Sequence, residues 1–228
     1  MTPEDEPFIR AIVDQPGDDT PRLVYADWLE DRDDPRGRFL RAEVGAMRAG
    51  TSKTAKLLKF AADGLDPVWV ARVGRPPFGV CTDQICAAEC SEPLLSPADI
   101  TTYESQHGIK LNPQHHALLL NWNGGAFKLI ACNVWSYSLN QGICVIVGGF
   151  SSLSCLELAE GVSGYHRPFV VVHRGSNGST VFVGTDGDGR VIYHRDGYNF
   201  GATGLLAVAD SLGQFLHMLT TPSPSGTK

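Results

Sequence analysis

Three cysteines in the middle of the chain form the first pattern that could do chemistry. Cys81, Cys86 and Cys90 are spaced C-x4-C-x3-C, and cysteine thiolates are common ligands of structural zinc. Such sites favour closely spaced cysteine pairs with a second Cys or His pair nearby. The histidines that could complete a site here lie further along the chain, at His107, His115 and His116. Because this spacing does not fit, we expect no bound metal and interpret all six cysteines as free thiols.

A further cysteine could serve as a nucleophile. Cys155 is followed by His166 and His173, and a cysteine beside a histidine base can carry out covalent hydrolysis. The apolar flanks of Cys155 are instead typical of a buried, unreactive thiol. The nearby stretch Gly-Phe-Ser-Ser-Leu at 149–153 lacks the second glycine of a nucleophile elbow. A hydrolase using Cys155 with His166 or His173 is therefore kept as an alternative, and no catalytic residue is assigned.

Acidic and glycine-rich turns are explained by backbone structure alone. Asp186 and Asp188 suggest a calcium loop, but an EF-hand needs glycine at its sixth position and glutamate at its twelfth. Those positions hold Val191 and Gly197. The Asp-Gly pairs are typical of a tight β-hairpin turn. The glycine pairs elsewhere do not continue as phosphate-binding loops, so no cofactor is expected.

The composition excludes several classes of protein. Of 228 residues, 43% are hydrophobic and 19% charged, and the formal net charge is -6. This content is too apolar for a disordered chain, and the net charge gives no general attraction to nucleic acid. No apolar run is long enough to cross a membrane, and the acidic N-terminus does not resemble a signal peptide. We expect a cytoplasmic protein without membrane contact.

The distribution of charge divides the chain into two parts. Residues 1–77 contain 26 charged residues, whereas residues 78–228 contain 18 and hold 19 of the 25 glycines. The first composition favours helices, and the second, with its apolar β-branched runs, favours a sheet. Adjacent prolines at 76 and 77 exclude helix at the joint. We predict a helical module at 1–75, a linker at 76–91, an α+β domain at 92–220 and a flexible tail at 221–228.

The helical module is itself polarised. Residues 1–34 carry a net charge of -8 and residues 35–77 a net charge of +6. This pattern indicates that acidic and basic helices neutralise each other within the module. The alternative is a basic face for nucleic acid, which the neighbouring acidic helices disfavour. That face would consist of Arg36, Arg38, Arg41, Lys53, Lys56 and Lys59.

The module resembles the bacterial repeat-companion domain over about residues 4–48. The resemblance rests on FIRAIV at 8–13, DDTPRLVYADWLE at 18–30 and DPRG at 34–37. It implies a small helical accessory module in a bacterial protein and assigns no activity to it.

The second part mixes helices and strands in an order typical of α+β proteins. Helices are predicted from Ser96 to Gly108, from Pro113 to the turn at 121–125, and from Gly204 through Leu219. Strands are predicted at 126–134, 143–150, 168–173, 180–184 and 191–194. The expected fold is a mainly antiparallel sheet flanked by helices, with the helical module in front of it.

This part also resembles the SUKH superfamily, which includes fungal cell-wall regulators of the Smi–Knr type and bacterial immunity proteins against toxins. The matching stretches are LSPADI at 95–100, GIKLNP at 108–113, NGG at 123–125, DGRVIY at 188–193 and VADSLGQFL at 208–216. They cover about residues 92–220. The resemblance implies structural roles, at helix ends and turns, for Glu104, Gly108, Leu111, Pro113, Asn123, Gly124, Gly125, Asp188 and Gly189.

The same resemblance implies a non-enzymatic, protein-binding function. The expected partner is a cognate bacterial toxin domain, and the net charge of -4 over residues 78–228 would suit a basic toxin. A regulatory scaffold without a toxin partner is the alternative that the cell-wall regulators suggest. Aromatic residues and arginine dominate protein interfaces, so we expect exposed partner-binding residues at Tyr137, Tyr165, Arg167 and Tyr198.

Overall fold

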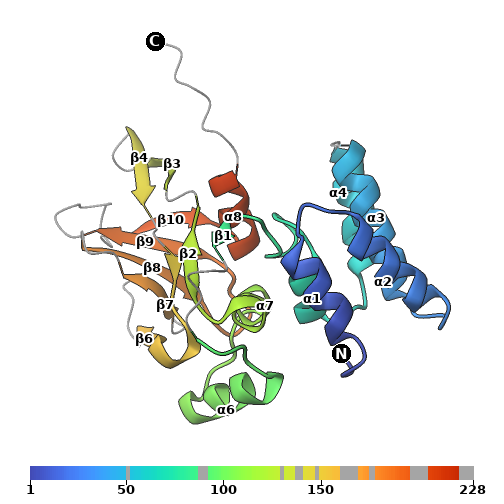
Figure 1. Ribbon diagram of the computed structural model, residues 1–228. Coiled ribbons are helices and arrows are strands. Elements are labelled where there is room, and N and C mark those ends of the chain that lie inside the picture. Colours follow the sequence, from blue (N-terminus) through green and yellow to red (C-terminus); the bar gives the residue numbers. More distant parts are fainter. Residues whose placement is uncertain are drawn as a thin grey trace.

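The computed structural model has a helical part followed by a part of strands and helices, which confirms the α+β fold (Figure 1). It describes residues 1–49, 52–86, 92–128, 131–136, 141–146, 149–159, 169–174, 178–195 and 205–220. Figure 1 shows the first five helices grouped on one side of the molecule and the larger sheet on the other. The helices of the first part therefore lie together in space, apart from the larger sheet of the second part.

The helical part contains α1 (Glu6–Asp14), α2 (Thr20–Glu30), α3 (Arg36–Ala49), α4 (Ser52–Ala62) and α5 (Pro67–Val73). Asp34 helps to start α3, because its carboxylate accepts a hydrogen bond from the backbone N–H of Arg36 at 2.9 Å. Gly37 lets α3 approach α2, since a Cβ at this position would lie 2.8 Å from the side chain of Glu30. The Asp-Pro-Arg-Gly sequence thus sets the close packing of α2 against α3.

Aromatic side chains fill the centre of this part. Tyr25 and Trp69 are fully buried, and the ring of Phe8 stacks on Tyr25 with the centroids 4.9 Å apart. The Tyr25 hydroxyl donates a hydrogen bond to Asp5 at 2.7 Å. Burial raises the pKa of Asp5, but hydrogen bonds led by the one from Arg36 outweigh it and bring this pKa to about 2. The carboxylate therefore stays charged inside the aromatic core.

The second part begins with a short strand and two helices and then runs through strands to a final helix. Its elements are β1 (Ile85–Cys86), α6 (Pro97–His107), α7 (Pro113–Trp122), β2 (Gly125–Phe127), β3 (Ala131–Ser136), β4 (Gln141–Ile146), β5 (Gly149–Phe150), a 3-10 turn η2 (Leu153–Cys155), β6 (Glu157–Ala159), β7 (Phe169–Arg174), β8 (Ser179–Gly184), β9 (Val191–Arg195), β10 (Leu206–Ala209) and α8 (Leu212–Thr220). The main sheet is antiparallel with the order β10-β9-β8-β7-β6. Two smaller sheets have the orders β1-β2-β5 and β3-β4.

The predicted hairpin between β8 and β9 is present. Asp186 and Gly187 both have positive φ, at 53° and 87°, as a type I′ turn requires. The backbone N–H of Asp186 also donates to the Lys110 carbonyl at 2.8 Å, which ties the turn to the segment between α6 and α7. The predicted strands at 126–134 and 143–150 are each divided into two shorter strands.

The predicted helix from Gly204 through Leu219 is wrong in its first half. Residues Leu206–Ala209 form strand β10, and the helix begins at Leu212. The free edge of β9 supplies hydrogen-bond partners to this segment, and Ser211 marks the helix start by accepting a hydrogen bond from the Gln214 backbone at 3.1 Å. The periodicity of the apolar residues fits a helix as well as a strand, so local pattern could not separate the two.

Residues 76–86 of the predicted linker are packed between the two parts. Val80 and Cys81 are fully buried and belong to a core that includes residues of both parts. Gly213 of α8 faces this segment so closely that a Cβ there would collide with the carbonyl oxygens of Pro77 and Gly79. This segment is not an exposed connection, and the domain boundaries stay a prediction.

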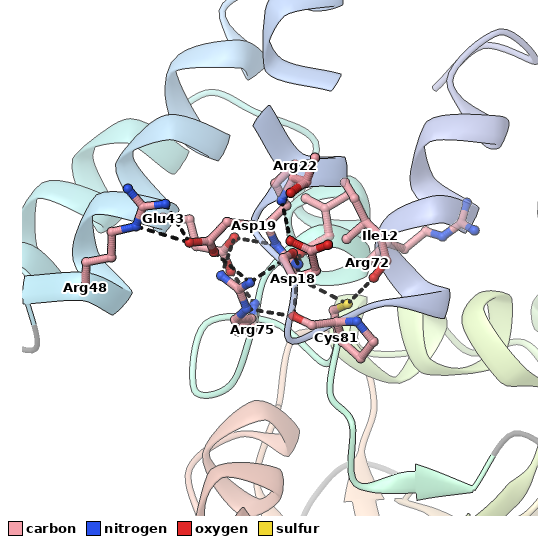
Figure 2. Close-up of polar contacts among 12 residues, drawn as sticks. Ile12, Asp18, Asp19, Arg22, Glu43, Arg48, Arg72, Arg75 and Cys81 are labelled. Atoms are coloured by element: carbon pink, nitrogen blue, oxygen red, sulfur yellow. Dashed lines mark hydrogen bonds and ion pairs between the residues drawn. The ribbon is translucent and has the colours of Figure 1, made fainter. Parts of the chain in front are cut away.

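A network of charged side chains fixes this segment to the helices (Figure 2). Arg22 donates from Nε to Glu43 at 2.9 Å and from Nη2 to the Val73 carbonyl at 3.0 Å. Arg75 contacts both Asp19 and Glu43: its Nη2 lies 3.0 Å from an Asp19 oxygen, and its backbone N–H donates to Glu43 at 2.5 Å (Figure 2). The Arg22–Glu43 pair joins α2 to α3 with the charges reversed, whereas Arg41 and Arg48 of α3 pair with Glu30 and Asp19 in the sense that the predicted neutralisation of acidic helices by basic ones requires.

Candidate functional site

The first group of residues to which the superfamily resemblance assigns structural roles lies in the connection from α6 to α7. The buried carboxylate of Glu104 accepts hydrogen bonds from the Leu111 backbone at 2.8 Å and from Lys110 Nζ at 2.5 Å. Gly108 ends α6 in the left-handed conformation, with φ of 63°. Pro113 occupies the first turn of α7, where its missing N–H costs nothing. The role of Glu104 is therefore structural: from inside the fold, its hydrogen bonds hold the turn between the two helices.

The Asn-Gly-Gly turn after α7 joins three separate segments. Asn123 has φ of 44°, and its amide donates to the Pro93 carbonyl at 2.7 Å while its side-chain oxygen accepts from the Leu153 N–H at 2.9 Å. Gly124 has φ of 97°, and a Cβ there would lie 3.0 Å from the Ser152 backbone nitrogen. Gly125 begins β2. The turn thus positions both the segment before α6 and the loop that carries Cys155.

The third group lies at the β8–β9 hairpin. Asp188 accepts hydrogen bonds from the backbone N–H of Arg190 at 3.0 Å and from its guanidinium. A Cβ at Gly189 would lie 3.0 Å from the side-chain nitrogen of Asn112. These contacts keep the hairpin close to the start of α7.

Replacing Gly124 by valine is expected to lower the free energy of unfolding by about 3 kcal/mol, because a β-branched residue meets both positive φ and the Ser152 backbone. Gly108→Val is the matched control. Gly108 also has positive φ but nothing lies within 4 Å of its hypothetical Cβ, so its loss should be only about 1–2 kcal/mol. Urea denaturation of both variants measures the difference, and equal losses would show that the Ser152 contact is unimportant.

The predicted partner-binding residues Tyr137, Tyr165, Arg167 and Tyr198 lie outside the described residues, as does His166. The same holds for Cys90 and for the side chains of Cys86, Cys132 and Cys144. Cys81 is described as a free thiol. Burial raises the pKa of this thiol to about 11. Within the described part of the chain, no group of three or more Cys, His, Asp or Glu side chains could hold a metal ion.

Cys155 is exposed, which contradicts the expectation of a buried thiol. The 3-10 turn of η2 places Leu156 in the interior and leaves Cys155 on the outside. Cys155 lines a cavity of about 450 Å³ together with His173 and Glu157. Burial lowers the pKa of His173, which favours the neutral imidazole. The recorded hydrogen-bond contact of the Cys155 sulfur is with the Ser154 hydroxyl at 3.8 Å, so cysteine and histidine share a cavity without a described hydrogen bond between them.

A second cavity, of about 710 Å³, is an open cleft between the helical part and the second part. We call it the interdomain cleft. Its lining is Arg10, Val13, Asp14, Pro16, Thr82, Asp83, Ile85, Glu92, Leu94, Asn121, Trp122 and Lys128. Buried apolar side chains form its floor, and Leu94 at its edge is 58% exposed.

Arg10 fixes one wall of the interdomain cleft. Its guanidinium donates to the carbonyls of Leu120 and Asn121, at the end of α7, and Nε pairs with Glu6 at 2.7 Å. Arg72 strengthens the same contact by donating to the Asn121 side chain at 3.0 Å. The sequence shows only that Glu6 and Arg10 are one turn apart on a helix. Nothing in the sequence indicates that Arg10 donates hydrogen bonds to backbone carbonyls more than a hundred residues away.

The chain matches no model of a known protein family, no curated protein and no solved structure. The resemblances to the repeat-companion domain and to the SUKH superfamily therefore stay predictions. No helix among the described residues is long and apolar enough to span a membrane.

Proposed function

We propose that the protein is a non-enzymatic binding protein of the toxin-immunity type and that its partner occupies the interdomain cleft. The observation that carries this proposal is the cleft itself, which combines an apolar floor, charged edges and the exposed side chain of Leu94. An apolar centre with a polar edge is the usual anatomy of a protein interface. A protein segment of the partner, with an apolar side chain for the floor, fits this surface.

The superfamily resemblance supports a partner of the toxin class. Glu104, Asn123 and Gly124, to which the resemblance assigns structural roles, form contacts inside the fold. Because these residues are used inside the fold, the choice of partner must depend on other residues at the surface. Among the described residues that line the cleft, three carry carboxylates and two carry basic groups, and this balance agrees with a basic partner such as a nuclease-type toxin. A regulatory scaffold that uses the same cleft for another protein remains the alternative.

The test is co-expression of the full chain with the toxin domains encoded beside it, scored by cell survival and by affinity of the purified pair. We expect protection, and we expect Leu94→Arg to weaken binding by at least about tenfold, because it places a large charge against the apolar floor. Val24→Arg is the matched control, since Val24 is similarly exposed on α2 and does not line the cleft. Equal binding by wild type and Leu94→Arg would rule the cleft out.

A hydrolase is the second candidate, because Cys155 and His173 line one cavity. This function predicts that the full chain turns over small ester or amide substrates and that Cys155→Ala abolishes the turnover. We expect no such activity. Turnover that depends on Cys155, together with no protection against any neighbouring toxin, would replace the binding proposal by the enzymatic one.

A further inference from the structure

Helix α4 carries the two most exposed large apolar side chains recorded in the described part of the chain. Phe60 is 81% exposed and Leu57 is 63% exposed. Residues three apart on a helix are neighbours on its surface, so these two side chains form one continuous apolar patch. A pair of this kind is unfavourable in water unless another surface covers it.

The opposite face of α4 holds the helix in place. Leu58 is buried in the core, and Ala61 and Ala62 pack against that core. Figure 1 shows α4 beside α3, within the group of N-terminal helices. Because one face of α4 is already packed, the helix cannot rotate to bury Phe60 and Leu57. Their exposure is fixed by the fold.

Two lysines without an ion-pair partner among the described residues lie beside this patch. Lys56 and Lys59 are exposed, residues 52–62 contain no acid, and neither lysine forms an ion pair with any described residue. Three of the four arginines of α3 differ in this respect. Arg36, Arg41 and Arg48 pair with carboxylates of α2 and of the neighbouring turns. Lys56 and Lys59 therefore leave uncompensated positive charge on α4, next to its apolar patch.

We propose that Lys56, Leu57, Lys59 and Phe60 form a second protein-binding surface, here called the α4 ridge, whose partner has an apolar groove bordered by carboxylates. The apolar pair would enter the groove as adjacent anchors of one helix, as in helix-in-groove recognition. The lysines would meet the carboxylates and orient the approach of the two proteins. This surface is separate from the interdomain cleft, because none of the four residues lines that cleft.

A protein groove fits the α4 ridge better than a membrane or a nucleic acid does. A helix that lies in a membrane inserts a whole apolar face, whereas the second apolar face of α4 is packed in the core. A nucleic-acid surface would need basic groups along a strand of phosphates, but three of the four arginines of α3 are already neutralised by carboxylates. Two adjacent apolar anchors with two lysines along one side of them match a short apolar groove with an acidic border.

The test is to select binders from a random library of displayed peptides and small helical proteins, using the full-length chain as bait. Binders are counted only if they do not bind Leu57→Ser/Phe60→Ser. We expect the selected binders to be rich in Asp and Glu around apolar residues. For a purified binder, Lys56→Glu/Lys59→Glu should weaken the affinity at least about tenfold at low salt and reduce its dependence on salt. Val24→Ser and Leu94→Arg are the controls, and both should bind as wild type does.

The proposal is overturned if no binder depends on Leu57 and Phe60, or if the binders that do are not acidic. It is also overturned if vesicles of phosphatidylglycerol and phosphatidylcholine, or single-stranded RNA, bind the wild type and not Leu57→Ser/Phe60→Ser. Thermal melting of every variant checks the fold. Because the substituted side chains are exposed, we expect melting curves like that of the wild type. These outcomes do not depend on the toxin test, which concerns Leu94.

Discussion

Replacing Glu43 by glutamine is expected to lower the free energy of unfolding by about 3–5 kcal/mol. The Glu43 side chain is 1% exposed, and that of its partner Arg22 is 0% exposed. One carboxylate oxygen lies 2.9 Å from Arg22 Nε, and the other accepts the backbone N–H of Arg75 at 2.5 Å. The glutamine has nearly the same shape but leaves the buried guanidinium of Arg22 without its counter-charge. Removing one charge of a buried pair costs far more than the intact pair contributes.

The matched control is Glu30→Gln, which removes a carboxylate from a pair on the same two helices. Glu30 accepts from Arg41 Nε at 2.8 Å, but both side chains are well exposed, so the loss should stay within about 1 kcal/mol. Urea denaturation of the full chain measures both variants. Similar losses for the two would mean that burial does not decide the strength of the Glu43 pair. Because Arg22 also donates to the Val73 carbonyl, the expected effect includes loosening of the segment that leads into the second part.

The parts of the fold that could be predicted from the sequence are those that a few adjacent residues determine. Ser96 and Asp99 form a capping box at the predicted start of α6, and Asp186 and Gly187 form the expected turn. In each case the side chain or the allowed φ acts within three or four residues, so the sequence alone contains the cause. The pairing of acidic with basic helices was predictable in kind, although not the identity of each pair.

The parts that could not be predicted depend on contacts between distant residues. Residues 206–209 form a strand because β9 lies beside them. Cys81 is buried because α1 and Arg22 cover it; the Ile12 carbonyl lies 3.7 Å from its sulfur. The interdomain cleft exists because Arg10 contacts the end of α7. A composition break suggests two separate domains, but it carries no information on the surface that the two share.

His115 should make the stability of the protein sensitive to acid. Its side chain is 1% exposed, and neither ring nitrogen has a hydrogen-bond partner among the described residues. Burial, with a smaller contribution from His116, lowers the pKa of His115 from 6.5 to about 3. The sequence suggested His115 only as a possible zinc ligand, and its position on the buried side of α7 explains why the unpaired ring matters. An uncharged buried imidazole without partners is tolerated at neutral pH, but its protonated form is not.

The sign of the effect follows from proton binding. As the pH falls below 6.5, the unfolded chain takes up a proton at His115 that the folded chain takes up only near pH 3, so stability is lost across this window. At about pH 4.5 the loss from this residue should be roughly 2–3 kcal/mol relative to pH 8. In His115→Leu this part of the pH dependence should disappear, and stability at pH 8 should rise by about 1 kcal/mol because two unpaired buried nitrogens are gone.

His115→Gln separates the two causes, since it removes the titration but keeps a buried polar group. The measurement is urea denaturation of the three proteins across this pH range. Because His116, His173 and Asp5 also have lowered pKa values, the difference between variants isolates His115. Parallel curves for wild type and His115→Leu would show that this histidine does not control the response to acid.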